Sequence, residues 1–508
     1  MKNYNVYWGD FHKHMSDLKN SDKIMESIKY TLDVYPVLCY PFKWFNKNGV
    51  ETYESTGLLS NSAKYWEKVK QIVKKYHKPG KFITFLGYEW PGNRTRWGDH
   101  NVIYFNENNP LDASWELNDL YNNLRSRKAI AIPHHVGYKV GNRGKDWELF
   151  DWELSPIAEI YSVHGSSEAV DAPIRLWSNQ DMSPITSGGT YVDALNAGCI
   201  VGAIGSNDYD GLPGSWNTGL AGILSENLSR ESIWKALKER RTYAVTGDKI
   251  KLFYSVNGNP MGSVISEKEK LEAKVKIECS QALDRIELIH NGVVAETYCH
   301  RGTWERKRQK KGIYKILNEF GWGLSGDYGF KDSEIQWNGR IEVLNGRLLG
   351  VEPRFVNIGQ WVKLTGKNSC TFKMISNRKT LLRAIQGLIL EVEGSETTSF
   401  KIDVNSRKII FALKEIENET KLFHYDNNIA QGFKKYFNVE KSELKNPDTF
   451  FHNAEKVKIG QAYPESAYIK EVVFKNLPVN KGRNYYYIRA SQIDGQMAWS
   501  SPVWMDKK

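Results

Sequence analysis

The first half of the chain alternates amphipathic stretches with short, wholly apolar runs. Apolar residues at helical spacing predict amphipathic helices over residues 62–77, 117–124, 190–197 and 229–241. Apolar runs predict buried strands at residues 82–87, 129–132 and 199–204. Alternation of strands with helices over about 250 residues favours an α/β fold with a parallel sheet or a (β/α) barrel.

After about Gly247 the pattern changes to short segments in which apolar and polar residues alternate. Such segments predict strands at residues 251–256, 273–277, 285–289, 293–298 and 485–490. Turns are predicted at the Asn-Gly pairs 257–258, 291–292, 338–339 and 345–346. This half is therefore expected to be an all-β, sandwich-like region.

Length and charge divide the chain in the same way. Its 508 residues exceed one ordinary domain, and we expect a domain over 1–249 and a β-rich domain over 250–508, with an insertion at about 301–460. Residues 1–250 hold 29 basic and 29 acidic side chains, so the net charge of +11 lies entirely in the second half. A basic protein invites a nucleic-acid interpretation, but the balanced first half argues against it.

The cysteine content, the first residues and the apolar runs together bear on the cellular compartment. Five widely spaced cysteines argue against a disulfide framework and for a reducing environment. The first residues lack the pattern of a secretion signal, and no run of about 18 apolar residues indicates a membrane span. We expect a cytoplasmic protein, of unknown oligomeric state, that does not enter the membrane.

Histidine is concentrated where the strands are predicted to end. Seven of the eleven histidines lie within the first 164 residues. Histidines and acidic residues follow or adjoin apolar runs in six segments, at residues 10–14, 87–89, 98–100, 133–135, 161–164 and 205–210. Side chains at the carboxyl ends of barrel strands converge on one site. Imidazoles together with carboxylates suit zinc, iron or manganese, so the sequence predicts a metal site.

The order of these segments resembles a known family. Asp10-Phe11-His12-Lys13-His14, then Gly87-Tyr88-Glu89, a histidine before an apolar strand, Pro133-His134-His135 and Ser206-Asn207-Asp208 are similar to the motifs of the PHP (polymerase and histidinol phosphatase) superfamily. The similarity is greatest to its large branch that carries a domain-of-unknown-function label and is related to carbamate-hydrolase-type metallohydrolases. It covers residues 4–300 and about the last thirty residues.

The resemblance implies a distorted (β/α)7 TIM-like barrel that holds two or three divalent metals. Carried over by motif, His12, His14, Glu89 and Asp208 would bind one metal. Glu89 would also bridge to a second metal held by His100 and His134.

The third site of the family is incomplete in this chain. Its three histidines are replaced by Asn20, by the stretch 38–41 and by Asp210. We therefore expect a binuclear centre of zinc, manganese or iron, and a third metal is doubtful.

Metal-activated water would then serve as the nucleophile of a hydrolase, most simply a phosphoesterase. His164 and His135 are candidates for the proton donor to the leaving group, with second roles as ligand orienters left open. Asp10 and Asp99 are candidates to hold the ligand histidines, and Asp10 is a further catalytic candidate.

Four residues in loops after the ligand segments are candidates to bind a small, anionic substrate. They are Arg94, Arg96, Arg143 and Trp97.

Two other functions remain open from the sequence. The same metal chemistry would hydrolyse a carboxylic ester, carbamate or amide, since only the pocket decides the substrate. Alternatively, a degenerate metal barrel could accompany polyanion binding through the basic run at residues 306–311 beside Trp304.

Overall fold

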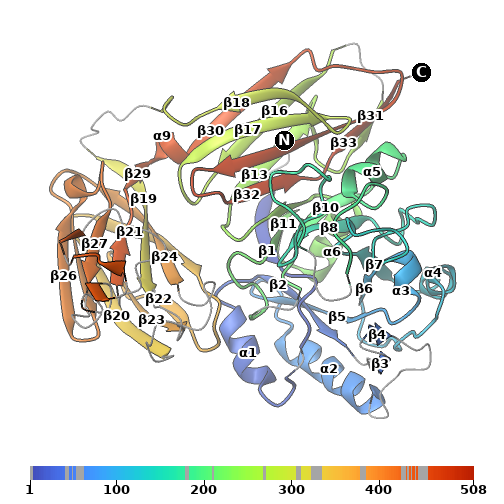
Figure 1. Cartoon of the computed structure of the whole chain (residues 1–508), viewed down its shortest axis with the longest axis horizontal. Helices are drawn as coiled ribbons and strands as arrows, with labels where there is room; N and C mark the ends of the chain where they lie inside the picture. The colour runs from blue at the N-terminus through green and yellow to red at the C-terminus, as the bar shows by residue number, and fades with distance from the viewer. Residues whose placement is uncertain are drawn as a thin grey trace. The chain divides into compact units, whose positions relative to one another are not determined.

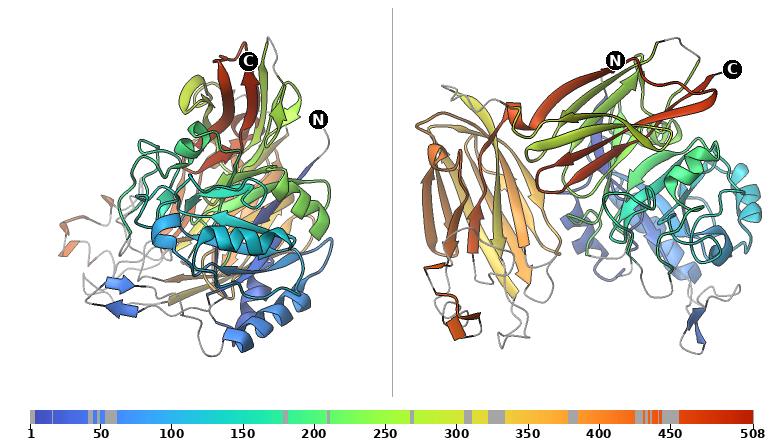
Figure 2. Two further views of the ribbon diagram at one scale, coloured as in Figure 1. Left: turned by 90° about the vertical axis from the view of Figure 1, so that its right-hand side faces the viewer. Right: turned by 45° about the horizontal axis from the view of Figure 1, so that its top comes forward.

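The computed structural model describes residues 4–15, 17–40, 45–47, 50–52, 62–177, 182–208, 211–266, 270–304, 311–321, 334–377, 385–424, 431, 434–435, 437–440, 442–443 and 456–507. The chain divides into two compact units (Figures 1 and 2). Unit 1 comprises residues 1–278, 284–299 and 470–508, and unit 2 comprises residues 279–283 and 300–469. Unit 2 covers the residues at which an insertion is predicted, whereas the predicted boundary at 249/250 falls inside unit 1.

Unit 1 begins with the predicted alternation of strands and helices (Figure 1). Its strands up to residue 245 are β1 (Asn5–Gly9), β2 (Val34–Cys39), β3 (Phe45–Lys47), β4 (Val50–Thr52), β5 (Ile83–Glu89), β6 (His100–Tyr104), β7 (Ala129–Pro133), β8 (Ile157–Ser162), β9 (Gly165–Ser166), β10 (Gly202–Gly205), β11 (Leu220–Ser225) and β12 (Thr242–Val245). Its helices are α1 (Ser21–Ile28), α2 (Ser62–Tyr76), α3 (Arg94–Trp97), α4 (Leu117–Arg125), α5 (Tyr191–Asn196) and α6 (Arg230–Lys238). The helices predicted at 62–77, 117–124, 190–197 and 229–241 are all present, with small shifts at their ends.

Strands β1, β2, β5, β6, β7, β11 and β12 belong to one sheet in which strand direction changes along the width. The order β12-β11-β1-β2-β5-β6-β7 is continuous, and β10-β8-β9 forms a second, short sheet. The pairs β1–β2, β2–β5 and β8–β10 are parallel, as the alternation predicts, but β5–β6, β6–β7 and β1–β11 are antiparallel. Only residues 90–99 join β5 to β6, which is shorter than a parallel crossover needs.

The strands of this sheet are buried because their side chains are mostly apolar. Every residue of β2, β5 and β7 is buried, because helices cover the sheet. Helix α2 packs its apolar face on β2 and β5, burying Trp66, Val69, Ile72 and Val73. The sheet is thus a rigid frame whose strand ends can hold polar side chains in fixed positions.

The rest of unit 1 consists of strands from both sides of unit 2 in the sequence. They are β13 (Lys251–Val256), β14 (Asn259–Pro260), β15 (Val264–Ile265), β16 (Glu272–Glu278), β17 (Leu283–His290), β18 (Val293–Cys299), β30 (Ile469–Lys475), β31 (Gly482–Gln492), β32 (Met497–Ser500) and β33 (Val503–Lys507). Strand β32 pairs with β12, so the end of the chain extends the first sheet.

Unit 2 contains two antiparallel sheets, ordered β21-β24-β19-β28-β27 and β22-β23-β20-β25-β26, with β29 paired to β19. Its elements are β19 (Gly312–Gly321), β20 (Glu334–Leu344), β21 (Arg347–Arg354), β22 (Trp361–Leu364), β23 (Ser369–Asn377), β24 (Ile385–Gly394), β25 (Ser399–Val404), β26 (Arg407–Ala412), a 3-10 helix (Leu413–Glu415), β27 (Lys421–His424), β28 (Lys456–Ile459), β29 (Tyr463–Pro464) and α9 (Glu465–Tyr468). Apolar side chains from both sheets share one core, which is a sandwich arrangement.

One predicted turn in this unit is wrong. Asn338-Gly339 lies inside β20 rather than between strands. A side chain at position 339 would collide with Phe372 and the carbonyl of Asp403, so this glycine serves close packing of neighbouring strands. By contrast, Asn257, Asn291 and Asn345 have positive φ angles, as Asn-Gly turns require.

Candidate metal centre

The predicted ligands gather at one edge of the unit 1 strands. Asp10 and His12 follow β1, Glu89 is the last residue of β5, His134 follows β7 and Asp208 follows β10. His100 is the first residue of β6, but β6 runs antiparallel to β5 and β7, so its start lies at the same edge. The expectation that site residues follow the carboxyl ends of strands therefore holds for the parallel strands. For β6 the site residue lies at the amino end instead.

His12 lies between two carboxylates. Its Nδ1 is 2.7 Å from Glu159 Oε2, and its Nε2 is 3.4 Å from Asp208 Oδ1. The other oxygen of Asp208 lies 2.6 Å from His164 Nε2. All four side chains are buried. A ring nitrogen bonded to a carboxylate fixes the tautomer of the ring, which leaves the opposite nitrogen of His12 directed at the site.

Burial lowers the pKa of His12, but the carboxylates of Asp208 and Glu159 outweigh this effect and raise the pKa to about 10. Without a metal, both nitrogens of the His12 ring are therefore protonated at neutral pH, and the ring is positively charged. Burial also opposes ionisation of Asp208, yet His12 and His164 hold the pKa of this carboxyl below its ordinary value. The carboxylates of Asp208 and Glu159 thus stabilise a positive charge at this position of the site.

Glu89 joins this group to a second set of charges. Its Oε2 lies 2.9 Å from His14 Nε2, and its Oε1 lies 2.5 Å from Arg94 Nη1. Arg94 Nη1 is also 3.0 Å from Asp99 Oδ1, and Arg143 Nε is 2.7 Å from Asp99 Oδ2. Although burial raises the pKa of Asp99, the two guanidinium groups lower it well below its ordinary range.

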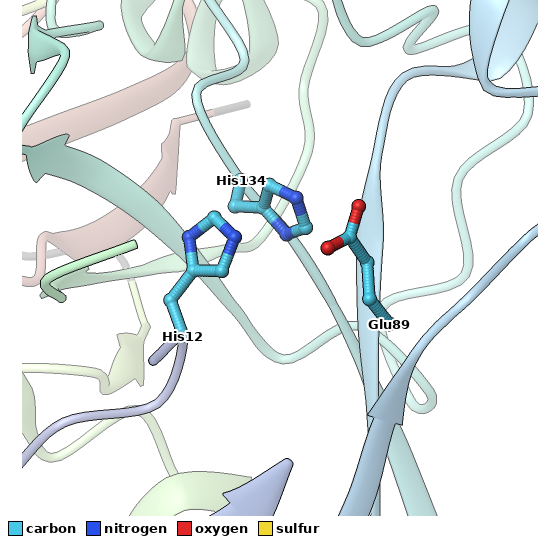
Figure 3. A group of neighbouring side chains, drawn as sticks. All are labelled: His12, Glu89 and His134. Carbon is cyan, nitrogen blue, oxygen red and sulfur yellow. The ribbon is translucent and has the colours of Figure 1, made fainter. Parts of the chain in front are cut away.

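His134 lies at the centre of the site, with 1% of its surface exposed. Neither ring nitrogen has a hydrogen-bond partner in the described part of the chain, and its ring centroid lies 3.8 Å from that of His12. Figure 3 shows the His12 and His134 rings side by side, with the Glu89 carboxylate turned toward His134. Burial lowers the pKa of His134 well below its ordinary value, so the ring is neutral and offers a lone pair.

Two groups of three side chains could each hold a metal ion. One contains His12, Glu89 and His134, and the other contains Asp99, His134 and His135. Within each group the ligand atoms lie within 4.8 Å of one another. These are the groups found among the described residues, and both depend on His134. Imidazole and carboxylate donors fit a divalent transition metal.

His135 and His134 converge, although adjacent strand residues point to opposite faces. Their ring centroids are 4.5 Å apart, because β7 ends at Pro133 and His135 has a φ of +33°. Burial lowers the pKa of His135 to about 3. Asp208, with a φ of +82°, shares this uncommon left-handed geometry, which is concentrated at functional sites.

Other predicted site residues contact the protein rather than the central cluster. Asp10 accepts backbone N–H bonds from His12, Asn207 and Gly214 and thereby fixes two loops of the site. His100 Nδ1 lies 3.1 Å from the carbonyl oxygen of Gly98. His100 belongs to neither three-residue group.

The four candidate substrate ligands differ in exposure. Arg94 and Arg143 are buried and paired with carboxylates. Arg96 is exposed and lies over the ring of Trp97, 4.3 Å from its centroid. Trp97 is buried, and its indole N–H donates to Glu116. Of these four, Arg96 presents the most accessible charge.

Three residues make contacts in the site that the sequence did not predict. Glu159 orients His12, Asp99 belongs to a ligand group, and Tyr138 lies 3.2 Å from His164 Nδ1 through its hydroxyl. Glu159 is an acidic residue inside the wholly buried strand β8. An acidic residue in a predicted buried strand could have indicated this role, because a buried carboxylate needs a partner.

No helix among the described residues is long and apolar enough to cross a membrane.

Sequence comparisons find relatives for part of the chain. Residues 42–172 match a family described as a protein of unknown function (DUF3604). An uncharacterized protein of Chlamydia pneumoniae is 26% identical over 314 residues, which cover 58% of this chain and 49% of that protein. An uncharacterized protein of Chlamydia muridarum is 24% identical over 316 residues, with the same shares covered. The chain thus spans about half the length of the curated relatives it matches.

Among solved structures, the chain is similar to a two-domain protein of Bacteroides vulgatus that contains a predicted PHP-like metal-dependent phosphoesterase. The sequence identity is 11% and the TM-score is 0.30, over 81% of this chain and 96% of that chain.

Proposed function

We propose that the chain is a metal-dependent hydrolase of the PHP type, phosphoesterase-like, built on a distorted (β/α)7 barrel. The observation that carries this proposal is His134, which is buried beside His12 and Glu89 and whose two ring nitrogens have no partner among the residues that the structure describes. An unpaired buried polar group costs about 1–3 kcal/mol, so a ligand that uses it explains its presence. A divalent zinc, manganese or iron ion fits the donor set.

His12, Glu89 and His134 are the residues that would hold the metal, with His14 and Asp208 adjacent. The Nδ1–H of His12 donates to Glu159, which directs Nε2 toward the site. When bound, the metal would supply activated water and polarise the scissile bond. Two metals are the prediction from sequence, but the two ligand groups share His134 and cannot both use the same nitrogen atom.

Proton transfer in the reaction is assigned to His164. Its Nε2 lies 2.6 Å from Asp208 Oδ2 and its Nδ1 lies 3.2 Å from the Tyr138 hydroxyl, so the ring has a polar neighbour on both sides. A ring held in this way can give a proton to a leaving group at a fixed position. His135, with a pKa near 3, is neutral at physiological pH and fits a ligand role better than that of a proton donor.

The substrate is proposed to be a small molecule, with an anionic phosphoester as the first candidate. A non-phosphate ester, carbamate or amide would use the same residues. Chromogenic p-nitrophenyl phosphate, bis(p-nitrophenyl) phosphate and p-nitrophenyl acetate distinguish monoester, diester and carboxylic ester hydrolysis.

Elemental analysis of protein purified without chelators tests the proposal directly. Bound zinc, manganese or iron is expected, and removal with EDTA should abolish hydrolysis until one of these metals is restored. The proposal is wrong if the folded protein binds none of the three ions at saturating concentration. The exchange Arg96→Gln separates substrate from metal effects, since it should alter KM for anionic substrates and leave the metal content unchanged.

A further inference from the structure

Arg94 is a buried cation inside the cluster of ligand residues. It begins the short helix α3, five residues after Glu89, and only 2% of its surface is exposed. Its guanidinium contacts Glu89, Asp99 and the hydroxyl of Tyr40. Arginine stays charged in proteins. Burial lowers the pKa of Arg94, but Asp99, Tyr40 and Glu89 outweigh burial and raise the pKa above its ordinary value.

The two oxygens of Glu89 face different partners. Oε2 lies 2.9 Å from His14 Nε2, whereas Oε1 is 2.5 Å from Arg94 Nη1. A carboxylate that bridges two cations offers one oxygen to each. The Arg94 guanidinium therefore already contacts one of the two oxygens that Glu89 would need to bridge two metals.

Asp99 is neutralised in the same way. Its Oδ1 accepts from Arg94 Nη1 at 3.0 Å, and its Oδ2 accepts from Arg143 Nε at 2.7 Å. A divalent ion in the second ligand group would have to displace these contacts and sit beside two fixed positive charges. Carboxylate–guanidinium bonds of this kind are strong. The first ligand group contains no residue paired with Arg143 and keeps His12 and His134 available.

We propose that the Arg94 guanidinium is the permanent second cation of this site, so that the chain binds one divalent metal where two are expected from its motifs. The metal would lie at His12, Glu89 and His134, and Arg94 would hold Glu89 in position from the opposite side. Arg94 is thus a positioning residue. This inference rests on the proposed function only in requiring that the first group binds metal.

Metal stoichiometry tests the inference with three proteins. Full-length wild type, Arg94→Gln and the control Arg96→Gln are freed of metal, saturated with Zn²⁺, desalted and analysed for bound zinc. Arg96 lies on the same helix but is exposed over Trp97. About one ion per chain is expected for wild type and for Arg96→Gln. About two are expected for Arg94→Gln, because this exchange removes one of the two cations on Asp99 and frees its Oδ1 for an ion, while Arg143 holds only Oδ2.

Two ions in the wild type would overturn the inference and leave the proposed function intact, whereas no ion would overturn both. A folded Arg94→Gln variant that still binds one ion would also overturn the inference. If that variant does not fold, electron paramagnetic resonance of the Mn²⁺-loaded wild type decides the question. Spectra of isolated Mn²⁺ support a single metal, and spectra of a spin-coupled pair contradict it.

Discussion

The two compact units differ in the kind of buried polar atom that lacks a hydrogen-bond partner among the described residues: histidine nitrogens in unit 1, and atoms such as Asn318 Oδ1 in unit 2. In unit 2 the indole N–H of Trp337 donates to Ser376 at 2.6 Å, and Gln360 donates to Gln386 at 2.8 Å. In unit 1 both ring nitrogens of His134, and one each of His100 and His135, lack partners among the described residues. Both ligand groups that were found lie in unit 1.

This difference suggests separate roles: unit 2 contributes stability, and unit 1 contains the candidate functional site. Paired polar groups in a core specify its packing at little net cost, whereas unpaired ones cost about 1–3 kcal/mol each. The described residues of unit 2 contain no three-residue group that could hold a metal, and its two sheets share one apolar core, so unit 2 resembles a structural sandwich. Unit 1 contains an unfavourable arrangement whose cost a bound cation would offset. Mutations in the two units should accordingly affect different measurements.

The largest expected effect is on metal binding by unit 1. His134→Ala removes the residue common to both ligand groups, so metal affinity and hydrolysis should fall by more than about 100-fold, beyond the loss typical of an outer partner. Equilibrium dialysis with Zn²⁺ and turnover of p-nitrophenyl phosphate measure both. His77→Ala is the control, because His77 lies at the end of α2 outside both groups. Undiminished zinc binding by His134→Ala would contradict the assignment.

Much of the site was predictable because its chemistry is local in sequence. A metal site was predicted from polar residues at strand ends, and His12, Glu89, His134 and Asp208 were assigned as its ligands through the family resemblance. These four side chains lie close together in the structure. The direction of β6 was not predictable from its own residues, because sheet pairing depends on non-local contacts.

The role of Arg94 illustrates the limit of sequence reasoning most clearly. A loop arginine after a ligand segment was expected to clamp an anionic substrate, yet it lies buried against Glu89 and Asp99. Its guanidinium contacts Asp99, five residues further along the chain, and Tyr40, which lies on a distant segment. Likewise, His135 converges with His134 through one positive φ angle, which the alternation of strand residues does not anticipate.

The next effect is confined to the stability of unit 2. Trp337 is 2% exposed and packs against Phe320 in the shared core, so Trp337→Ala should cost about 3–5 kcal/mol of unfolding free energy. Differential scanning calorimetry and zinc analysis are the measurements, and zinc content should not change. The partly exposed Trp361→Ala should cost much less. Loss of zinc from folded Trp337→Ala would break the proposed separation of roles.

A smaller effect, dependent on pH, is expected from the buried Lys145 of unit 1. Burial lowers its pKa to about 7, below the value of about 10.4 in the unfolded chain. The unfolded state therefore binds more protons between these values, and this group makes unfolding free energy rise with pH across that window. Below pH 7 its burial penalty is fully present.

Lys145→Met should remove that pH dependence. The ammonium group donates to the carbonyls of Asp146 and Leu149, and the loss of these bonds offsets part of the gain. We expect a net stabilisation of about 2 kcal/mol at pH 6, with none remaining at pH 10. Urea unfolding at the two pH values measures it, with the exposed Lys139→Met as control. An equal effect at both pH values would contradict the buried-charge explanation.

The smallest effect tests whether ordinary helix capping in unit 1 is independent of the metal site. Thr190 caps α5: its hydroxyl accepts from the Asp193 N–H, and Asp193 accepts from the Thr190 N–H in return. Thr190→Ala should cost about 1 kcal/mol. Asn20 precedes α1 without a side-chain capping bond, so Asn20→Ala should lower the unfolding free energy by less.

Urea unfolding gives the free energies of both variants. Zinc binding should be unchanged in both, because neither residue belongs to a ligand group. A loss of zinc from Thr190→Ala would show that the stability of this helix and the metal site are coupled.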